Sequence, residues 1–319
     1  MHTLIRYSLL VVIFWTWRAR ADDGWDGHIY SLIWENDATA GSDKHYTQGA
    51  GLSYLSQDDA LPAWLHTTSR ALPAFGYDVA AQKWGLAIIQ QIYTPEQLQT
   101  PTPPPDDRPY AGWLYGTATL QRRGKTHGGI PLIETLSIDL GVIGPESLAE
   151  QTQKSWHGVK PQGWDHQLRF EPGINLRYNR SYLLAAHLND GNWGGQIIPY
   201  FDTSLGNIHT YLQLGSDFRF GYNIPDPFAT THNPGKPFGA YLFTRLQGRI
   251  VLRNIFLDGN TFKDSPSVDK RYLVGDVRFG IALAFKHLEL TAAHTLISQE
   301  FTTQHGLDSY STATLTLKF

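Results

Sequence analysis

The chain has 319 residues, of which 41% are hydrophobic and none is cysteine, and its formal net charge at pH 7 is −3. This charge provides no basic field for nucleic acid, and the lack of cysteine excludes a disulfide framework. No apolar run after residue 21 approaches the roughly 20 residues of a membrane helix. Aromatic residues nevertheless make up 13% of the chain, which is typical of a transmembrane β-barrel with aromatic girdles.

The first residues predict a secretory signal peptide. Arg6 gives a basic start, residues 9–15 are apolar but too few to span a bilayer, and residues 19–21 read Ala-Arg-Ala, which supplies small residues for cleavage. We therefore expect a signal peptide at residues 1–21 and a barrel domain at residues 22–319.

Apolar and polar residues alternate in segments that recur along the mature chain, as expected for strands whose two faces meet different surroundings. The last segment alternates in this way and stops on Phe319, as bacterial outer-membrane barrels typically do. A soluble barrel or sandwich would alternate too, but the signal peptide and the aromatic content favour an all-β, antiparallel transmembrane barrel with short helices in its loops. Twelve strands are predicted, at residues 28–36, 47–56, 83–93, 111–121, 132–143, 166–188, 195–206, 211–221, 239–256, 269–285, 287–299 and 308–319.

Hairpin parity assigns each loop to one side of the membrane. If the first strand runs outward from the periplasm, the loops after odd-numbered strands are extracellular. Two loops on the periplasmic side are long, namely residues 57–82, with a helix expected around residues 60–72, and residues 222–238, which are rich in Pro and Gly. The extracellular loops are predicted at residues 37–46, 94–110, 144–165, 207–210, 257–268 and 300–307.

The extracellular loop at residues 144–165 is the most informative stretch. It opens on a Gly-Pro pair, and Glu146 and Glu150 favour the start of a short polar helix, where the helix dipole is positive. This helix is predicted to end near His157. A lone histidine is more often a surface residue than a functional one. Parity, however, places His157 on the rim where the first strand ends and the second begins.

Three polar residues lie on that rim: Asn36 and Asp37 after the first strand, and Thr47 in the second. Asn36 lies on the same face of its strand as the residues that are predicted to face lipid. A polar side chain exposed to lipid is energetically unfavourable unless it has a function or another segment shields it, and the helix before His157 is predicted to shield Asn36. Asp37 can help to hold a hard cation such as Ca²⁺, and a histidine beside a cation can activate water for attack on an ester. Taken singly, each residue also suits an ordinary turn or strand.

Four sequence blocks resemble the lipid A 3-O-deacylases of the LpxR type and occur in the same order. The blocks are IWENDATAGSDKHYTQGAGLSY, DDRPYAGWLYGTATLQ, LSIDLGVIGPESLAEQTQKSWH and GWDHQLRFEP, and the resemblance covers residues 28–319. It implies a Ca²⁺-dependent barrel of twelve strands in the outer membrane of a Gram-negative bacterium, and we expect a monomer. It also implies an ester hydrolase that removes the 3′-linked acyloxyacyl group from lipid A, the lipid part of lipopolysaccharide in the outer leaflet.

The resemblance also implies the site residues. The catalytic positions would be Asn36, Asp37, Thr47 and His157. His157 would be the general base, Asp37 would help to hold Ca²⁺, and Asn36 and Thr47 would bind the metal or orient the reacting groups. The chain departs from the family pattern in two places, because residues 158–164 lack an acidic residue that some members carry and residues 94–110 lack a lysine that would aid the oxyanion.

The block around Arg108 has two interpretations. At the outer rim its guanidinium would match a lipid A phosphate, but it could instead pair with a neighbouring aspartate or a carboxylate in the lumen. The aromatic residues that follow, Tyr110, Trp113 and Tyr115, are expected at the outer interface, where such side chains gather.

Three alternatives to the deacylase stay open. One is an outer-membrane phospholipase with a Ser-His pair that draws on Ser147, Ser155 or Ser31. Another is a non-catalytic barrel, either a porin whose inward polar residues line a narrow lumen or an adhesion scaffold. The last is a degenerate member of the resembled family that binds lipid without turnover.

Overall fold

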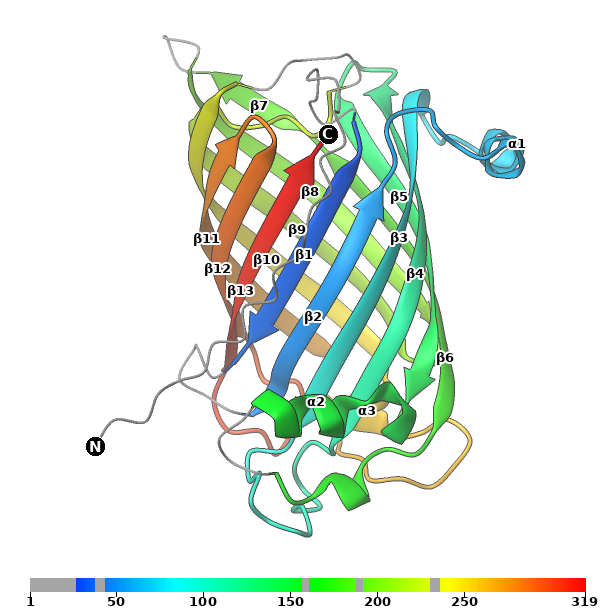
Figure 1. Ribbon diagram of the computed structural model, residues 1–319, viewed down its shortest axis with the longest axis vertical. Coiled ribbons are helices and arrows are strands. Elements are labelled where there is room, and N and C mark those ends of the chain that lie inside the picture. Colours follow the sequence, from blue (N-terminus) through cyan, green and yellow to red (C-terminus); the bar gives the residue numbers. More distant parts are fainter. Residues whose placement is uncertain (1–26, 38–43, 157–160, 188–191, 230–235) are drawn as a thin grey trace.

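A computed structural model describes residues 27–37, 44–156, 161–187, 192–229 and 236–319. The described chain forms one closed antiparallel sheet (Figure 1), because β1 pairs with β13 and β6 pairs with β8. Both β6 and β7 pair with β8, so they are two parts of one strand interrupted at Leu183, and the barrel has the twelve strands that were predicted. The strands are β1 (Ile29–Asn36), β2 (His45–Leu55), β3 (Tyr77–Thr94), β4 (Ala111–Thr126), β5 (Pro131–Ile143), β6 (Glu171–Tyr182), β7 (Leu184–His187), β8 (Trp193–Gly206), β9 (His209–Tyr222), β10 (Phe238–Asn254), β11 (Leu273–Phe285), β12 (Leu288–Ile297) and β13 (Asp308–Lys318).

The short helices lie at the two ends of the barrel (Figure 1), and both helices expected from the sequence are present. One end carries the longer loops with η2 (Pro145–Ser147), α2 (Ala149–Trp156), η3 (Trp164–His166) and α3 (Ile255–Asp258). The opposite end carries α1 (Ala63–Ala71) and the C-terminus. Longer loops mark the extracellular end of such barrels, so α2 is extracellular and α1 periplasmic. None of the described helices has the length and apolar character needed to cross a bilayer.

Side chains alternate between a lipid-facing wall and the lumen. On β1, the exposed residues Tyr30, Leu32 and Trp34 share one face of the sheet. Near the periplasmic end the outward rings form a belt, with 5.2 Å between the ring centroids of Tyr30 and Tyr54 and 5.4 Å between those of Tyr54 and Trp84. Aromatic belts lie at the headgroup level of a bilayer, so this belt fixes the height of the periplasmic interface.

The sequence mispredicted two features of the wall. The first six residues of β3 were assigned to the preceding loop, because the pairing with β4 shifts between Val79 and Ala81 and this bulge breaks the alternation. Trp113 and Tyr115 were expected at the outer interface but point into the lumen, where their rings stack with centroids 3.7 Å apart. Tyr110 is also buried, against the ring of Trp164.

Paired charges line the lumen, since a buried charge is costly without a partner. Asp276, which was predicted to face inward, is buried and accepts a bond from Arg249. The other lumen ion pairs include Arg177–Asp139 at 2.7 Å, Arg245–Asp217 at 2.5 Å and Arg278–Glu35 at 3.2 Å.

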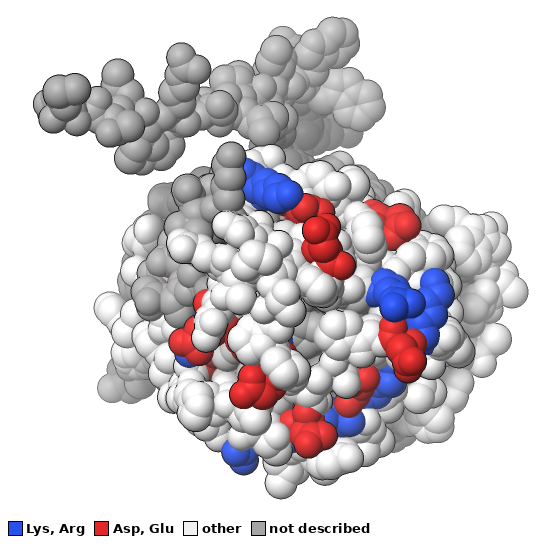
Figure 2. Space-filling model, turned by 90° about the horizontal axis from the view of Figure 1, so that it is seen from below, with Lys and Arg blue, Asp and Glu red and all other residues white. Residues whose placement is uncertain are grey.

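Buried side chains pack at both ends of the lumen. At the extracellular end Phe256 of α3 is fully buried and its ring stacks on Tyr93, with 4.0 Å between centroids. At the periplasmic end Phe228 packs against Leu183 and Ile198. Seen from the extracellular end, Figure 2 shows mainly uncharged side chains, with Lys and Arg groups next to Asp and Glu groups and no wide patch of one sign. The described part of the extracellular face therefore offers no broad charged surface.

Candidate active site

The β1–β2 hairpin brings together three of the four predicted site residues at the extracellular end. The side-chain amide of Asn36 donates to the carbonyl of Thr47 at 3.2 Å, and the backbone N–H of Asp37 donates to the same carbonyl at 3.3 Å. All three residues are buried, with Asp37 and Thr47 fully inaccessible. The Thr47 carbonyl therefore fixes Asn36 and Asp37 against the start of β2.

A bulge in β2 takes Thr47 out of the regular strand pairing. The pairing of β2 with β3 shifts between Tyr46 and Gln48, which leaves Thr47 as the extra residue. Its hydroxyl lies 2.6 Å from the hydroxyl of Thr94, the last residue of β3. Because the bulge arises from the pairing of two strands, sequence alone did not identify Thr94 as a neighbour of the site.

The donor set at this hairpin suits a hard cation. Asp37 offers a carboxylate and Asn36 an amide oxygen, which are ligand types that Ca²⁺ accepts, and the hydroxyl oxygens of Thr47 and Thr94 lie 2.6 Å apart beside them. The backbone N–H of Lys44 donates to Asp37 Oδ2 at 2.6 Å, which holds the carboxylate in place. The described residues contain no group of three or more His, Cys, Asp and Glu side chains that could hold a metal ion. A cation here would therefore rely on one described carboxylate and on neutral oxygens.

The α2 segment packs on the outside of the barrel at the height of this hairpin. Asn36 pairs with Gln48, Gln48 with Ile92, and Ile92 with Gly112, so these residues form one row across the outer wall from β1 to β4. Helix α2 contacts β3 and β4, and Figure 1 shows it lying across the lower ends of the strands. Three strand spacings separate β1 from β4, roughly 14 Å.

The fit of this segment on β4 depends on a glycine. A Cβ atom on Gly112 would come within 2.1 Å of Ser147 Oγ and 2.2 Å of Ala149 Cβ. The side-chain amide of Gln90 also donates to the Ser147 carbonyl at 2.7 Å, which fastens the segment to β3. His157, the fourth predicted site residue, lies outside the described residues and directly follows Trp156, the last residue of α2.

Arg108 lies at the extracellular end but is not exposed there. It is fully buried, its guanidinium donates to Glu300 at 2.7 Å, and it lies 5.3 Å from the ring centroid of Tyr93. Burial alone would raise the pKa of Glu300, but the charges of Arg108 and Arg249 hold it below its usual value. The alternative of a structural pair with a lumen carboxylate is thus the arrangement observed, and Arg108 presents no exposed guanidinium to a lipid phosphate.

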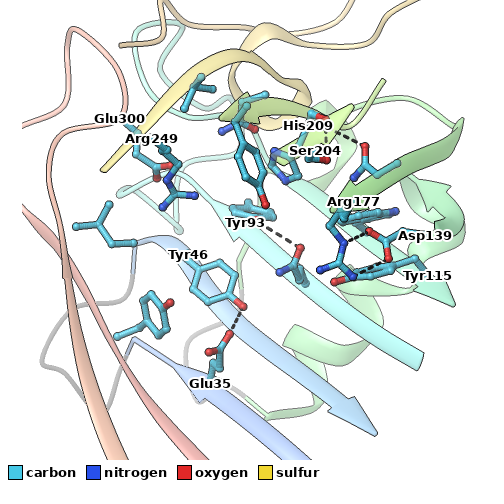
Figure 3. Close-up of a pocket in the computed structure, with 18 of the residues that line it drawn as sticks. Glu35, Tyr46, Tyr93, Tyr115, Asp139, Arg177, Ser204, His209, Arg249 and Glu300 are labelled. Atoms are coloured by element: carbon cyan, nitrogen blue, oxygen red, sulfur yellow. Dashed lines mark hydrogen bonds and ion pairs between the residues drawn. The ribbon is translucent and has the colours of Figure 1, made fainter. Parts of the chain in front are cut away.

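A polar cavity of about 300 Å³ inside the barrel is the other candidate site (Figure 3). Its charged groups bind one another, since Tyr46 donates to Glu35 at 2.5 Å and Arg177 donates twice to Asp139, at 2.7 and 2.8 Å. His209 also lines it and contacts aromatic rings such as Phe256. Its acidic and basic groups are thus committed to one another, whereas the outer-wall hairpin lies beside the lipid, so the hairpin is the better candidate.

Comparison with known proteins gives a consistent result. The sequence profile of a family described as "Outer membrane protein LpxR" matches residues 7–319. Among solved structures, LpxR from Salmonella typhimurium has a TM-score of 0.71 at 20% identity, covering 91% of this chain and all of that one. The β-domain of the Bordetella autotransporter BrkA reaches a TM-score of 0.48 at 10% identity, covering 92% of this chain and 99% of that one. A search of curated proteins found no match.

Proposed function

The chain belongs to the LpxR family of outer membrane proteins, and from this premise we propose that it is a lipid A ester hydrolase of the outer membrane. The reaction would remove the 3′-linked acyloxyacyl group of lipid A in the outer leaflet, as the resemblance of the four sequence blocks implies. The observation that carries the proposal is the group of Asn36, Asp37 and Thr47 at the extracellular end, in one row with a helix packed on the outer wall. A substrate held in the membrane would approach such a site from the side of the barrel.

The proposed roles follow from the chemistry of each group. Asp37, with Asn36 and Thr47, would hold Ca²⁺, which when bound would stabilise the negative charge that develops on the carbonyl oxygen of the ester. An imidazole nitrogen of His157 would take a proton from water as the water oxygen bonds to the carbonyl carbon. The bond from that carbon to the sugar oxygen then breaks, and the proton passes to the departing alkoxide. Lys44 would keep Asp37 oriented through its backbone N–H.

A serine mechanism has less support. Ser147 is buried and its hydroxyl donates to the Gly144 carbonyl at 2.6 Å, while the hydroxyl of Ser31 lies 3.1 Å from that of Thr316. Ser155 is exposed on α2 and donates to a carbonyl of its own helix. Among the described residues, each partner is a group other than histidine, so none of these hydroxyls shows there the serine–histidine hydrogen bond that typifies an activated nucleophile.

The test is mass spectrometry of lipid A from cells that express the wild-type chain, His157→Ala or no copy. The proposal expects loss of the 3′-linked acyloxyacyl mass only with the wild type. Purified protein should lose activity in EDTA and regain it with Ca²⁺, while a serine-directed inhibitor should have no effect. Unchanged lipid A in wild-type cells, together with an inactive purified barrel in the presence of Ca²⁺, would refute hydrolysis. Inhibition by the serine reagent would support the phospholipase instead.

A further inference from the structure

The segment that carries α1 is fastened to the outer wall of the barrel, beside the lipid. The side chain of Arg122 on β4 points outward, because Arg122 lies an even number of residues along the strand from the exposed, outward-facing Gly116. Its guanidinium donates to the carbonyls of Ser69, Leu72 and Pro73 at 3.3, 3.0 and 3.0 Å. Arg122 also pairs with the buried Glu134, so the segment shields an outward ion pair from the membrane.

The height of α1 is set by the aromatic belt. Trp84, the β3 member of that belt, donates its indole N–H at 2.9 Å to the carbonyl of Ala60, three residues before α1 begins. Gln82, the next outward residue of β3, binds Ser69 of the helix. Two strand residues span roughly 7 Å, so α1 lies just beyond the belt, at the level of lipid headgroups. Figure 1 shows α1 standing out sideways from the wall, in the direction of the membrane plane.

The face of α1 turned away from the barrel is unusually apolar for an exposed helix. Trp64 is 70% exposed and Phe75, just after the helix, is 69% exposed. The hydroxyls of Thr67 and Thr68, which share the face of Trp64, both donate at 3.0 Å to carbonyls one turn earlier. These hydroxyls are therefore satisfied within the helix, and the face presents an indole ring and methyl groups.

The charge of the segment suits phospholipid headgroups. Residues 60–76 contain Arg70 and His66 and no Asp or Glu. Arg70 is exposed in the last turn of α1. A guanidinium beside an interfacial indole is a combination that binds lipid phosphate while the ring lies among the acyl-chain ends. The backbone at Phe75 is held by Arg180, which donates to its carbonyl at 2.6 Å, so the exposed ring is presented by a fixed chain.

We propose that α1 together with Phe75 is an interfacial anchor that lies in the headgroup region of the periplasmic leaflet and binds phospholipid there. Trp64 and Phe75 insert among the acyl-chain ends, and Arg70 binds phosphate. The anchor fixes the height and tilt of the barrel in the membrane. It rests on the barrel and its location in the outer membrane and is independent of the proposed hydrolysis.

The absence of cysteine in the chain makes a direct test feasible. Trp64→Cys and Phe75→Cys are each labelled with a nitroxide in vesicles of phosphatidylethanolamine and phosphatidylglycerol, and collision with oxygen is compared with collision with a water-soluble nickel complex. Leu86→Cys, 53% exposed on the β3 wall, gives the value for lipid. His127→Cys, exposed in the β4–β5 turn at the same end, gives the value for water.

The proposal expects both anchor labels to shift from the His127 value toward the Leu86 value, with the headgroup region between them. Replacing Arg70 by Gln should reduce this shift for the Trp64 label more in vesicles with phosphatidylglycerol than in purely zwitterionic vesicles. Labels at Trp64 and Phe75 that match the His127 label would overturn the proposal. Labels shielded from both reagents would also overturn it, because they would indicate a protein contact in place of lipid.

Discussion

Gly112 offers a way to move α2 without touching the β1–β2 hairpin. Its outward Cβ position is filled by Ser147 Oγ and Ala149 Cβ, which would lie 2.1 and 2.2 Å from an added methyl group. Ordinary contacts begin near 3.4 Å, so the Gly112→Ala variant must push the start of α2 outward by more than 1 Å. The shift passes along the helix toward His157.

The expected effect follows from that displacement. Overpacking of this kind costs about 1–3 kcal/mol, which a twelve-stranded barrel tolerates. A misplacement of about 1 Å in a reacting group costs on the order of 10²-fold in rate. We therefore expect Gly112→Ala to lower kcat/KM for lipid A deacylation by roughly two orders of magnitude while the heat-modifiable gel migration of a folded barrel is retained.

Gly116→Ala is the matched control, because it changes the same strand and the same face. A Cβ there meets only the Ala87 carbonyl, at 3.7 Å, which is an ordinary contact. Its activity should equal that of the wild type, measured by release of the acyl group from purified lipid A. Equal loss in both variants would attribute the effect to β4 itself, and full activity in Gly112→Ala would refute the role of α2 in positioning the base.

Four further predictions follow. His157→Ala and His157→Asn should lower activity by at least about 10²-fold, while His127→Ala on the periplasmic turn should be nearly neutral; the reverse pattern would refute both the role and the topology. Asp37→Ala should raise the Ca²⁺ concentration needed for half-maximal activity or abolish turnover, and full activity in EDTA with no bound metal would contradict this. Glu300→Gln should destabilise the barrel by about 3–5 kcal/mol at neutral pH, because it leaves Arg108 buried without its partner. Since the pKa of Glu300 is lowered, its contribution is present above the unfolded value near 4.3 and is lost as pH falls through the folded value, so the variant and the wild type should converge in acid, as thermal unfolding would show. Planar bilayers with the purified protein should show no stable conductance steps, since ion pairs cross the lumen and Phe256 and Phe228 pack at its two ends.

Much of the fold could be predicted because it depends on local patterns. Alternation along each strand gave the number of strands, and it failed where the pattern itself is interrupted, as at the Val79–Ala81 bulge. The two-part strand β6–β7 was predicted as one segment, because alternation does not mark the break at Leu183, where the chain packs against Ile198 and Phe228.

The candidate site was predictable to the extent that it lies within one hairpin. Asn36, Asp37 and Thr47 are close in sequence, and a hairpin must bring them together. The partner of Arg108 was named only as one of several carboxylates, since Glu300 is 192 residues away and reaches it through loop packing. Thr94 and Gly112 were missed because their positions depend on the register of β2, β3 and β4.

Two helices cover polar groups on the outside of this barrel. Comparing them distinguishes a helix with a structural role from one with a proposed catalytic role. At the periplasmic end α1 covers Arg122, which is fully bonded to carbonyls and to Glu134, so the cover and the covered group satisfy each other. At the extracellular end α2 packs on the row of outer-wall residues that includes Asn36. The polar groups there are a carboxylate, an amide and hydroxyls, which suit a cation, and the residue after the helix is a histidine. An outward polar residue in a membrane wall therefore requires a cover in either case. It indicates catalysis only where the covering segment brings a group that can accept a proton.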